Sequence, residues 1–128
     1  MSVCGNHRQA ASQAIRTLRR DVRWKPQRDI QHLAKRKIMG HLPDATTIED
    51  YNALIIAILS DASSLVYHYP FGARDYYAVS GKIGDTMWLV IFGEDGILET
   101  AFPPGNLSDY LTKRGLVLLG HLEEVGYA

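Results

Sequence analysis

The stretch of sequence that decides the fold runs from residue 76 to residue 102, YYAVSGKIGDTMWLVIFGEDGILETAF. It holds three short runs rich in β-branched and aromatic residues, separated by glycine and aspartate, at 76–82, 87–92 and 97–102. The middle run is apolar on both faces, as expected of a central strand that is covered on both sides. The tripeptide EDG at 94–96 is a hairpin turn signal. We therefore expect a mostly antiparallel sheet in this half of the chain.

Helical patterns occupy the N-terminal half of the chain. Residues 8–23 are rich in strong helix formers, and Pro26 and Gly40 suit the first turn and the end of a second helix. Thr46-x-x-Glu49 and Thr47-x-x-Asp50 each match a capping box at the start of a third helix. Two further strands and a short helix complete the pattern, at 65–69, 116–119 and 106–113. Helices first and a mostly antiparallel sheet afterwards predict an α+β domain.

The neutral net charge of the chain hides a split between its two parts. Residues 1–40 hold ten Lys and Arg against two Asp, a formal charge of +8, and residues 41–128 carry −8. Such a split indicates a surface that faces a polyanion, a basic helix that pairs with an acidic sheet, or an acidic partner protein on the basic face. Because residues 8–23 hold few apolar positions, we expect residues 1–25 to form a basic helical arm ahead of one domain at 26–128.

Composition also bears on where the protein works. The longest apolar runs, such as residues 53–59, fall well short of the ~20 residues that a membrane span needs. The first ten residues lack the apolar core of a signal peptide, and the single cysteine, Cys4, cannot form an internal disulfide. These features predict a cytoplasmic protein with no membrane partner.

The motifs of metal and cofactor enzymes are missing from the sequence. It has no CxxC, no HExxH, no Walker-type loop and no nucleotide fingerprint, and its five histidines lie at no familiar ligand spacing. We therefore expect neither metal nor cofactor. The chemistry best matched to what is left is metal-free RNA cleavage. That reaction needs a base near the 2′-hydroxyl, an acid near the departing 5′-oxygen, and cations or hydrogen-bond donors on the phosphorane.

The second helix and its end supply the first candidates for this chemistry. His32 and Arg36 lie one turn apart, so they either place a proton-transfer group beside a phosphate clamp or belong to a solvated helix face. His41 follows Gly40 at the helix end, where the helix dipole favours a protonated histidine, or it makes a cap contact. Lys37 either extends its ammonium group from the last turn into solvent or points into a cleft.

The helical periodicity also assigns two faces to the second helix. At 100° per residue, one arc is apolar and is expected to face the core; it consists of Ile30, Leu33, Ala34 and Ile38. The opposite arc is a cationic stripe that is expected to face outward, and it consists of Lys25, Arg28, His32, Lys35 and Arg36.

The strands supply the remaining candidates. Thr100 is expected to share one strand face with Leu98 and Phe102 and to point toward the helices, or it is simply a good strand former. Arg74 is the only arginine between residues 37 and 113, and it either binds phosphate or pairs with a carboxylate such as Asp75. Three further side chains could hydrogen-bond a substrate or stack on a base: His68, Tyr76 and Tyr77.

Two segments carry a family resemblance: RDIQHLAKRKIMGHLPDATTIEDYNALI at 28–55 and RDYYAVSGKIGDTMWLVIFGEDGILETAFPP at 74–104. In the second, a YY strand, an apolar strand, a DG turn and a strand ending TAFP follow one another. In this order of features the chain resembles the superfamily of barnase, EndoU, colicin and RelE-like nucleases (BECR), and more narrowly its bacterial and phage toxins. The resemblance covers roughly residues 28–120.

The resemblance implies N-terminal helices packed on a twisted sheet of four to five mostly antiparallel strands. It implies a metal-independent endoribonuclease toxin that cleaves tRNA or mRNA through attack of the 2′-hydroxyl, with an acidic antitoxin or immunity protein as partner. The expected catalytic residues are His32, His41, Arg74 and Thr100. The expected substrate-binding residues are Arg28, Lys35, Arg36, Lys37, His68 and Tyr77. The alternative is a non-catalytic module that binds RNA or a protein through the basic N-terminal helices.

Overall fold

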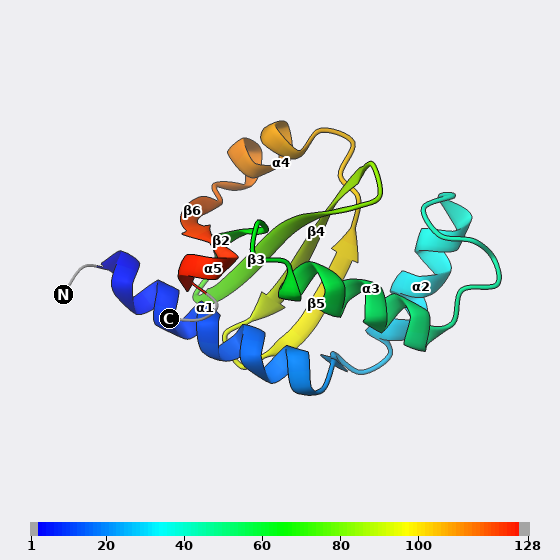
Figure 1. Cartoon of the computed structure of the whole chain (residues 1–128), viewed down its shortest axis with the longest axis horizontal. Helices are drawn as coiled ribbons and strands as arrows, with labels where there is room; N and C mark the ends of the chain where they lie inside the picture. The colour runs from blue at the N-terminus through cyan, green and yellow to red at the C-terminus, as the bar shows by residue number, and fades with distance from the viewer. Residues whose placement is uncertain (1–2, 126–128) are drawn as a thin grey trace.

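The computed structural model describes residues 3–125 and has a single mixed sheet at its centre (Figure 1). The six strands are β1 (Arg23–Trp24), β2 (Leu65–Phe71), β3 (Arg74–Ile83), β4 (Thr86–Gly93), β5 (Ile97–Phe102) and β6 (Val117–His121). Their order across the sheet is β1-β5-β4-β3-β2-β6. β1 runs parallel to β5, and all the other neighbours are antiparallel.

Five helices accompany the sheet: α1 (Val3–Arg20), α2 (Arg28–Ile38), α3 (Ile48–Ser60), α4 (Leu107–Arg114) and α5 (Leu122–Val125). The capping box at the start of α3 is formed, since the Thr47 side chain accepts from the Asp50 amide and the Asp50 carboxylate from the Thr47 amide. The predicted α+β class, with N-terminal helices on the sheet, is confirmed. The sheet has one strand more than expected, because β1 is only two residues long and leaves no periodicity to detect.

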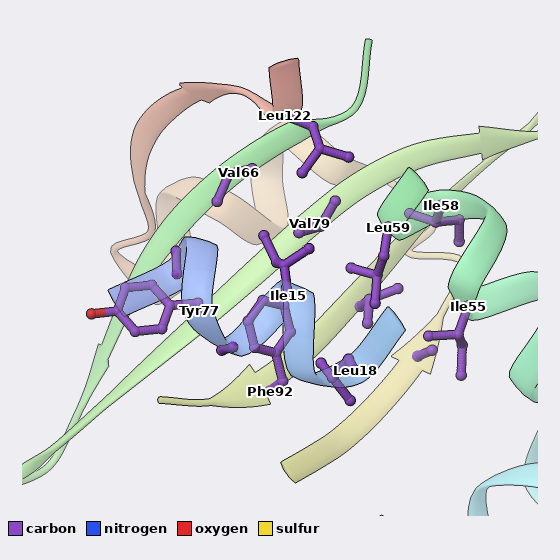
Figure 2. Close-up of a cluster of buried hydrophobic side chains, with 14 of the residues drawn as sticks. Ile15, Leu18, Ile55, Ile58, Leu59, Val66, Tyr77, Val79, Phe92 and Leu122 are labelled. Atoms are coloured by element: carbon purple, nitrogen blue, oxygen red, sulfur yellow. The ribbon is translucent and has the colours of Figure 1, made fainter. Parts of the chain in front are cut away.

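The main core lies on one face of the sheet, where α1, α3 and α5 cover it (Figure 2). Alternate residues of β4 point into this core, namely Trp88, Val90 and Phe92. The facing stripe of α3 recurs at helical spacing and consists of Tyr51, Ile55, Ile58 and Leu59. The buried side chains of β4 and of α3 pack against each other and form one cluster on this face of the sheet.

Helix α1 belongs to this core. Its buried residues form one stripe along the helix, Ala11, Ala14, Ile15 and Leu18, and the figure shows Ile15 and Leu18 among the side chains of the sheet and α3. The side chains of Arg8 and Arg19 also donate to the carbonyl oxygens of Leu119 and Leu59, at 2.9 Å and 2.7 Å. The narrow apolar stripe and these hydrogen bonds make α1 part of the core, whereas we expected a basic helical arm ahead of the domain.

The second face of the sheet carries a smaller cluster of buried residues, formed by Tyr67, Tyr69, Ala78, Leu89 and Ile91. Helix α4 covers part of it through Leu107, Tyr110 and Leu111. α4 is only eight residues long, and a cavity lies between it and the end of α2. None of the helices within residues 3–125 combines the length and the apolar character that crossing a membrane requires.

Replacing Ile15 by alanine tests whether α1 is part of the folded unit. We expect Ile15→Ala to lower the free energy of unfolding by about 2–5 kcal/mol, because it leaves a cavity in the main core. The matched control Ile38→Ala, on an exposed position of α2, should change it by less than about 0.5 kcal/mol. Denaturant titration measures both values. Equal small effects of the two substitutions would mean that α1 is a detachable arm.

Candidate functional site

Helix α2 has only part of the orientation that we expected. Leu33 of the predicted apolar arc packs against the main core as expected, but other positions of the two arcs differ. Ile30 and Ile38 are 70% and 85% exposed, whereas Arg36 is only 4% exposed. The rotation is set where the chain leaves β1, since the indole of Trp24 donates to Asn52 of α3 at 2.9 Å and pins the start of α2. The predicted orientation of the two arcs is therefore wrong for these residues: the turns that carry His32 and Arg36 face the protein.

The guanidinium of Arg36 is buried without a counter-ion. Its Nη1 donates to Nδ1 of His41 at 3.3 Å, its Nη2 lies 3.9 Å from the sulfur of Met39, and its Cζ lies 5.7 Å from the ring centre of Phe102. Its Nε has no hydrogen-bond partner, and no carboxylate among residues 3–125 forms an ion pair with it. Burial lowers the pKa of Arg36, but a guanidinium stays charged near neutrality.

His32 and Thr100 meet between α2 and β5. Nδ1 of His32 lies 3.3 Å from Oγ1 of Thr100, and the ring stacks on Trp24 at 5.9 Å between centres. Burial lowers the pKa of His32 most, and the nearby charges of Arg36, Arg28 and Lys35 lower it further, while Glu99 raises it. His32 is therefore a neutral imidazole at pH 7, able to accept a proton.

A β-bulge in β5 aims Thr100 at this site. Leu98 pairs with Phe92 but Thr100 pairs with Ile91, so two steps along β5 match one step along β4. Leu98 consequently lies in the main core, while Glu99 and Thr100 both face the opposite side. Our expectation that Leu98 and Thr100 share a face is wrong, because alternation fails at the bulge.

His41 lies three residues beyond the end of α2 and stays close to Arg36. Its backbone amide donates to the Arg36 carbonyl at 2.8 Å, which is the cap contact that we considered. Burial first, and the charge of Arg36 second, lower the pKa of His41. Both effects disfavour the protonated form of His41, which the helix dipole was expected to favour.

Two adjoining cavities form a groove beside these residues. The larger, of about 620 Å³, lies between the end of α2 and α4. Its cationic residues are Lys35, Arg36, Lys113 and Arg114, and His41 also lines it. Its one carboxylate, Asp109, pairs with Lys113 at 3.1 Å. The smaller, of about 310 Å³, reaches Thr100 and shares Tyr110 and Arg114 with the larger. We call the two together the groove.

The structure brings together some of the predicted site residues. Four of them line the groove, namely Lys35, Arg36, His41 and Thr100. His32 contacts Thr100 and reaches the groove through it. Arg28 is exposed on α2, and neither Arg28 nor Lys37 is among the lining residues.

Three predicted site residues lie elsewhere. Arg74 forms an ion pair at 3.8 Å with Asp95 rather than Asp75, and it lies over Tyr76. Tyr77 is buried in the main core, and His68 lies next to it on that same face of the sheet. His68 and Tyr77 are therefore separated from the groove by the sheet. The run of two tyrosines at 76–77 could not show which of them faces which side.

Several residues that line the groove were not among the predicted site residues. These are Tyr69, Phe71, Glu99, Tyr110, Lys113 and Arg114. The basic last turn of α4 was visible as a pattern, but its position over the second face of the sheet depends on the tertiary structure.

A cluster of His7, His68 and Asp75 offers three ligand atoms within 4.8 Å of one another. Its imidazoles already have partners, since His68 bonds Asp75 at 2.8 Å and His7 bonds the Tyr77 hydroxyl at 2.9 Å. The two imidazole rings are stacked, with ring centres 3.7 Å apart and ring planes at 19°, so their lone pairs lie in nearly parallel planes. One ring would have to turn before both could coordinate one ion.

Comparisons with models of known protein families, with curated proteins and with solved structures found no match.

The environment of His32 makes a prediction for its titration. We expect NMR to report a pKa for His32 below its ordinary value of 6.5, because burial and three nearby cations disfavour the charged ring. Arg28→Gln removes one of those charges from an exposed position, so it should raise the pKa partway toward 6.5. A His32 that titrates at or above 6.5 in the unmodified protein would contradict this description of the site.

Proposed function

We propose that the groove is the active site of a metal-independent endoribonuclease that cleaves RNA by attack of a 2′-hydroxyl on the adjacent phosphodiester. The observation that carries the proposal is the buried guanidinium of Arg36, which has no carboxylate partner within residues 3–125 and faces a cavity. Burying an unpaired charge costs several kcal/mol, so such a group suits a site that is completed by an anionic ligand.

A phosphodiester is an anion of the kind that would pair with the guanidinium of Arg36. The planar guanidinium lines the larger cavity, and such a group can bind two phosphate oxygens at once. Lys35 and Arg114 add positive charge along the same groove. The developing charge on the phosphorane would be stabilised by the same donors in a site partly shielded from water.

The proton transfers can be assigned to the groups nearest Arg36. Thr100 accepts the proton of the 2′-hydroxyl on Oγ1 and passes its own proton to Nδ1 of His32, as their 3.3 Å separation allows. His41 protonates the departing 5′-oxygen. A bound phosphate would offset the Arg36 charge that lowers the pKa of His41, so substrate binding itself favours the protonated acid.

The shape of the groove favours single-stranded RNA. Aromatic side chains line it beside the cations, including Phe102 and Tyr110 in the larger cavity and Tyr69 and Tyr76 in the smaller. Unpaired bases can stack on such rings, whereas bases within a duplex cannot reach them.

The test is incubation of the purified protein with total tRNA and total RNA in excess EDTA. We expect discrete fragments with 2′,3′-cyclic phosphate ends. His32→Ala and His41→Ala should each slow cleavage by roughly 10²- to 10⁴-fold, the contribution of general acid–base catalysis.

The matched control is His121→Ala, which removes an exposed histidine from the end of β6, outside the groove, and should leave the rate unchanged. Intact RNA with a mobility shift that fades as salt rises would replace the nuclease with the alternative, a non-catalytic RNA-binding module. Full activity in both active-site variants would overturn the residue assignment.

A further inference from the structure

The proposed function makes no use of the cluster formed by His7, His68 and Asp75. Three elements bring these side chains together, since His7 belongs to α1, His68 to β2 and Asp75 to β3. Their positions are scattered from residue 7 to residue 75, so no local spacing in the sequence marks them as one group. Our expectation that the chain needs no metal came from local spacing alone. It therefore does not bear on this cluster.

The register of the sheet places two of the three side chains side by side. His68 lies opposite Tyr77 in the ladder between β2 and β3, and Asp75 lies two residues before Tyr77 along β3. Residues two apart on a strand share a face, so His68 and Asp75 are diagonal neighbours on the side of the main core. The buried stripe of α1 fixes that helix over the same face and brings His7 to them.

Two imidazole nitrogens and one carboxylate oxygen form a donor set that suits Zn²⁺. Mg²⁺ and Ca²⁺ prefer oxygen ligands, whereas Zn²⁺ binds histidine and carboxylate together and accepts water as a fourth ligand. The three donor atoms of the cluster lie within 4.8 Å of one another. A tetrahedral zinc ion with bonds of about 2.0–2.1 Å needs its ligand atoms about 3.3 Å apart. A small movement of one side chain therefore completes the geometry.

His7 is the side chain that can make this movement. Its ring is stacked on that of His68, and a ring nitrogen binds a metal within the plane of its ring, so one ring has to turn. Rotation of an imidazole about its Cβ–Cγ bond has broad energy minima. The turn gives up the contact of His7 with the Tyr77 hydroxyl, which projects from the main core (Figure 2). His68 stays in place, because its side chain is only 13% exposed and its Nε2 lies 2.8 Å from Asp75.

We propose that His7, His68 and Asp75 bind one Zn²⁺ ion that ties helix α1 to strands β2 and β3. The site is structural and goes beyond the proposed function, because it lies across the sheet from the groove and takes no part in cleavage. The buried stripe of α1 begins at Ala11, and His7 lies one turn before it. The ion thus anchors the helix ahead of its apolar contacts. An ion that binds only the folded chain also raises the stability of the fold.

The experiment titrates ZnCl₂ into the whole, metal-free protein. We expect calorimetry to report one ion per chain. The Tm should rise by roughly 5–15 °C when free zinc is 100 times the Kd, and MgCl₂ should not reproduce the effect. Histidine NMR should show that zinc changes the ring resonances of His7 and His68. The resonances of the other three histidines should stay unchanged, namely His32, His41 and His121.

Two substitutions test the ligands. Asp75→Asn keeps the size of a partly exposed side chain, and His7→Ala removes an imidazole from the surface of α1. Each should weaken zinc binding at least about 10-fold, since even the loss of an outer-shell partner has such an effect. The matched control is His121→Ala, because His121 also pairs with a carboxylate, Glu124 at 3.1 Å, but does not belong to the cluster. It should leave the zinc affinity unchanged.

A thiol is the other group in the chain that binds zinc well. The side chain of Cys4 lies outside the described part of the structure, so the titration is repeated with Cys4→Ser, which should still bind one ion. Zinc binding that is lost in Cys4→Ser while the resonances of His7 and His68 stay unchanged would overturn the site.

The NMR readout uses the unmodified protein, so it decides the question even if a variant fails to fold. No zinc binding at millimolar concentration, or binding that survives both Asp75→Asn and His7→Ala, would also overturn the site. RNA cleavage in EDTA by a protein that binds no zinc would leave the nuclease standing and refute this inference. Zinc bound at the two histidines with RNA left intact would support the site while the proposed nuclease fails.

Discussion

The guanidinium of Arg36 is held out of water where α2 meets the second face of the sheet, and nothing negative neutralises it within residues 3–125. Burial lowers the pKa of His32 and of His41 most, and the charge of Arg36 lowers the pKa of both histidines further. The same group forms the wall of the larger cavity. A bound anion would therefore change the Coulombic environment of three functional side chains together.

The fold explains how one small domain keeps such a group and still has a stable core. One face of the sheet is closed by α1, α3 and α5, and its apolar residues make the main core (Figure 2). The other face is covered only in part by the short helix α4. The main core and the groove thus lie on opposite sides of the sheet. The bulge in β5 turns Thr100 toward the side that carries the groove.

Much of the fold was predictable, and the site was predictable only in part. Five strands and four helices follow from hydrophobic runs, a capping box and turn residues, because these signals are local. The orientation of α2 was not predictable from the sequence. It depends on the contacts of Trp24 and on the chain that leaves β1, and it leaves Ile30 and Ile38 in solvent. Likewise the bulge that redirects Thr100 arises from pairing with β4, and no feature of β5 alone marks it.

The central claim is that Arg36 is the anion receptor of the groove. The most direct measurement is the Nε–H resonance of Arg36 by nitrogen-15 NMR, with and without a single-stranded RNA whose 2′-hydroxyls are methylated and so cannot be cleaved. We predict that the resonance shifts on binding and that its proton becomes protected from exchange, since a bound phosphate fixes the guanidinium and fills the cavity that it lines. A resonance that stays unchanged while the RNA binds would contradict the claim.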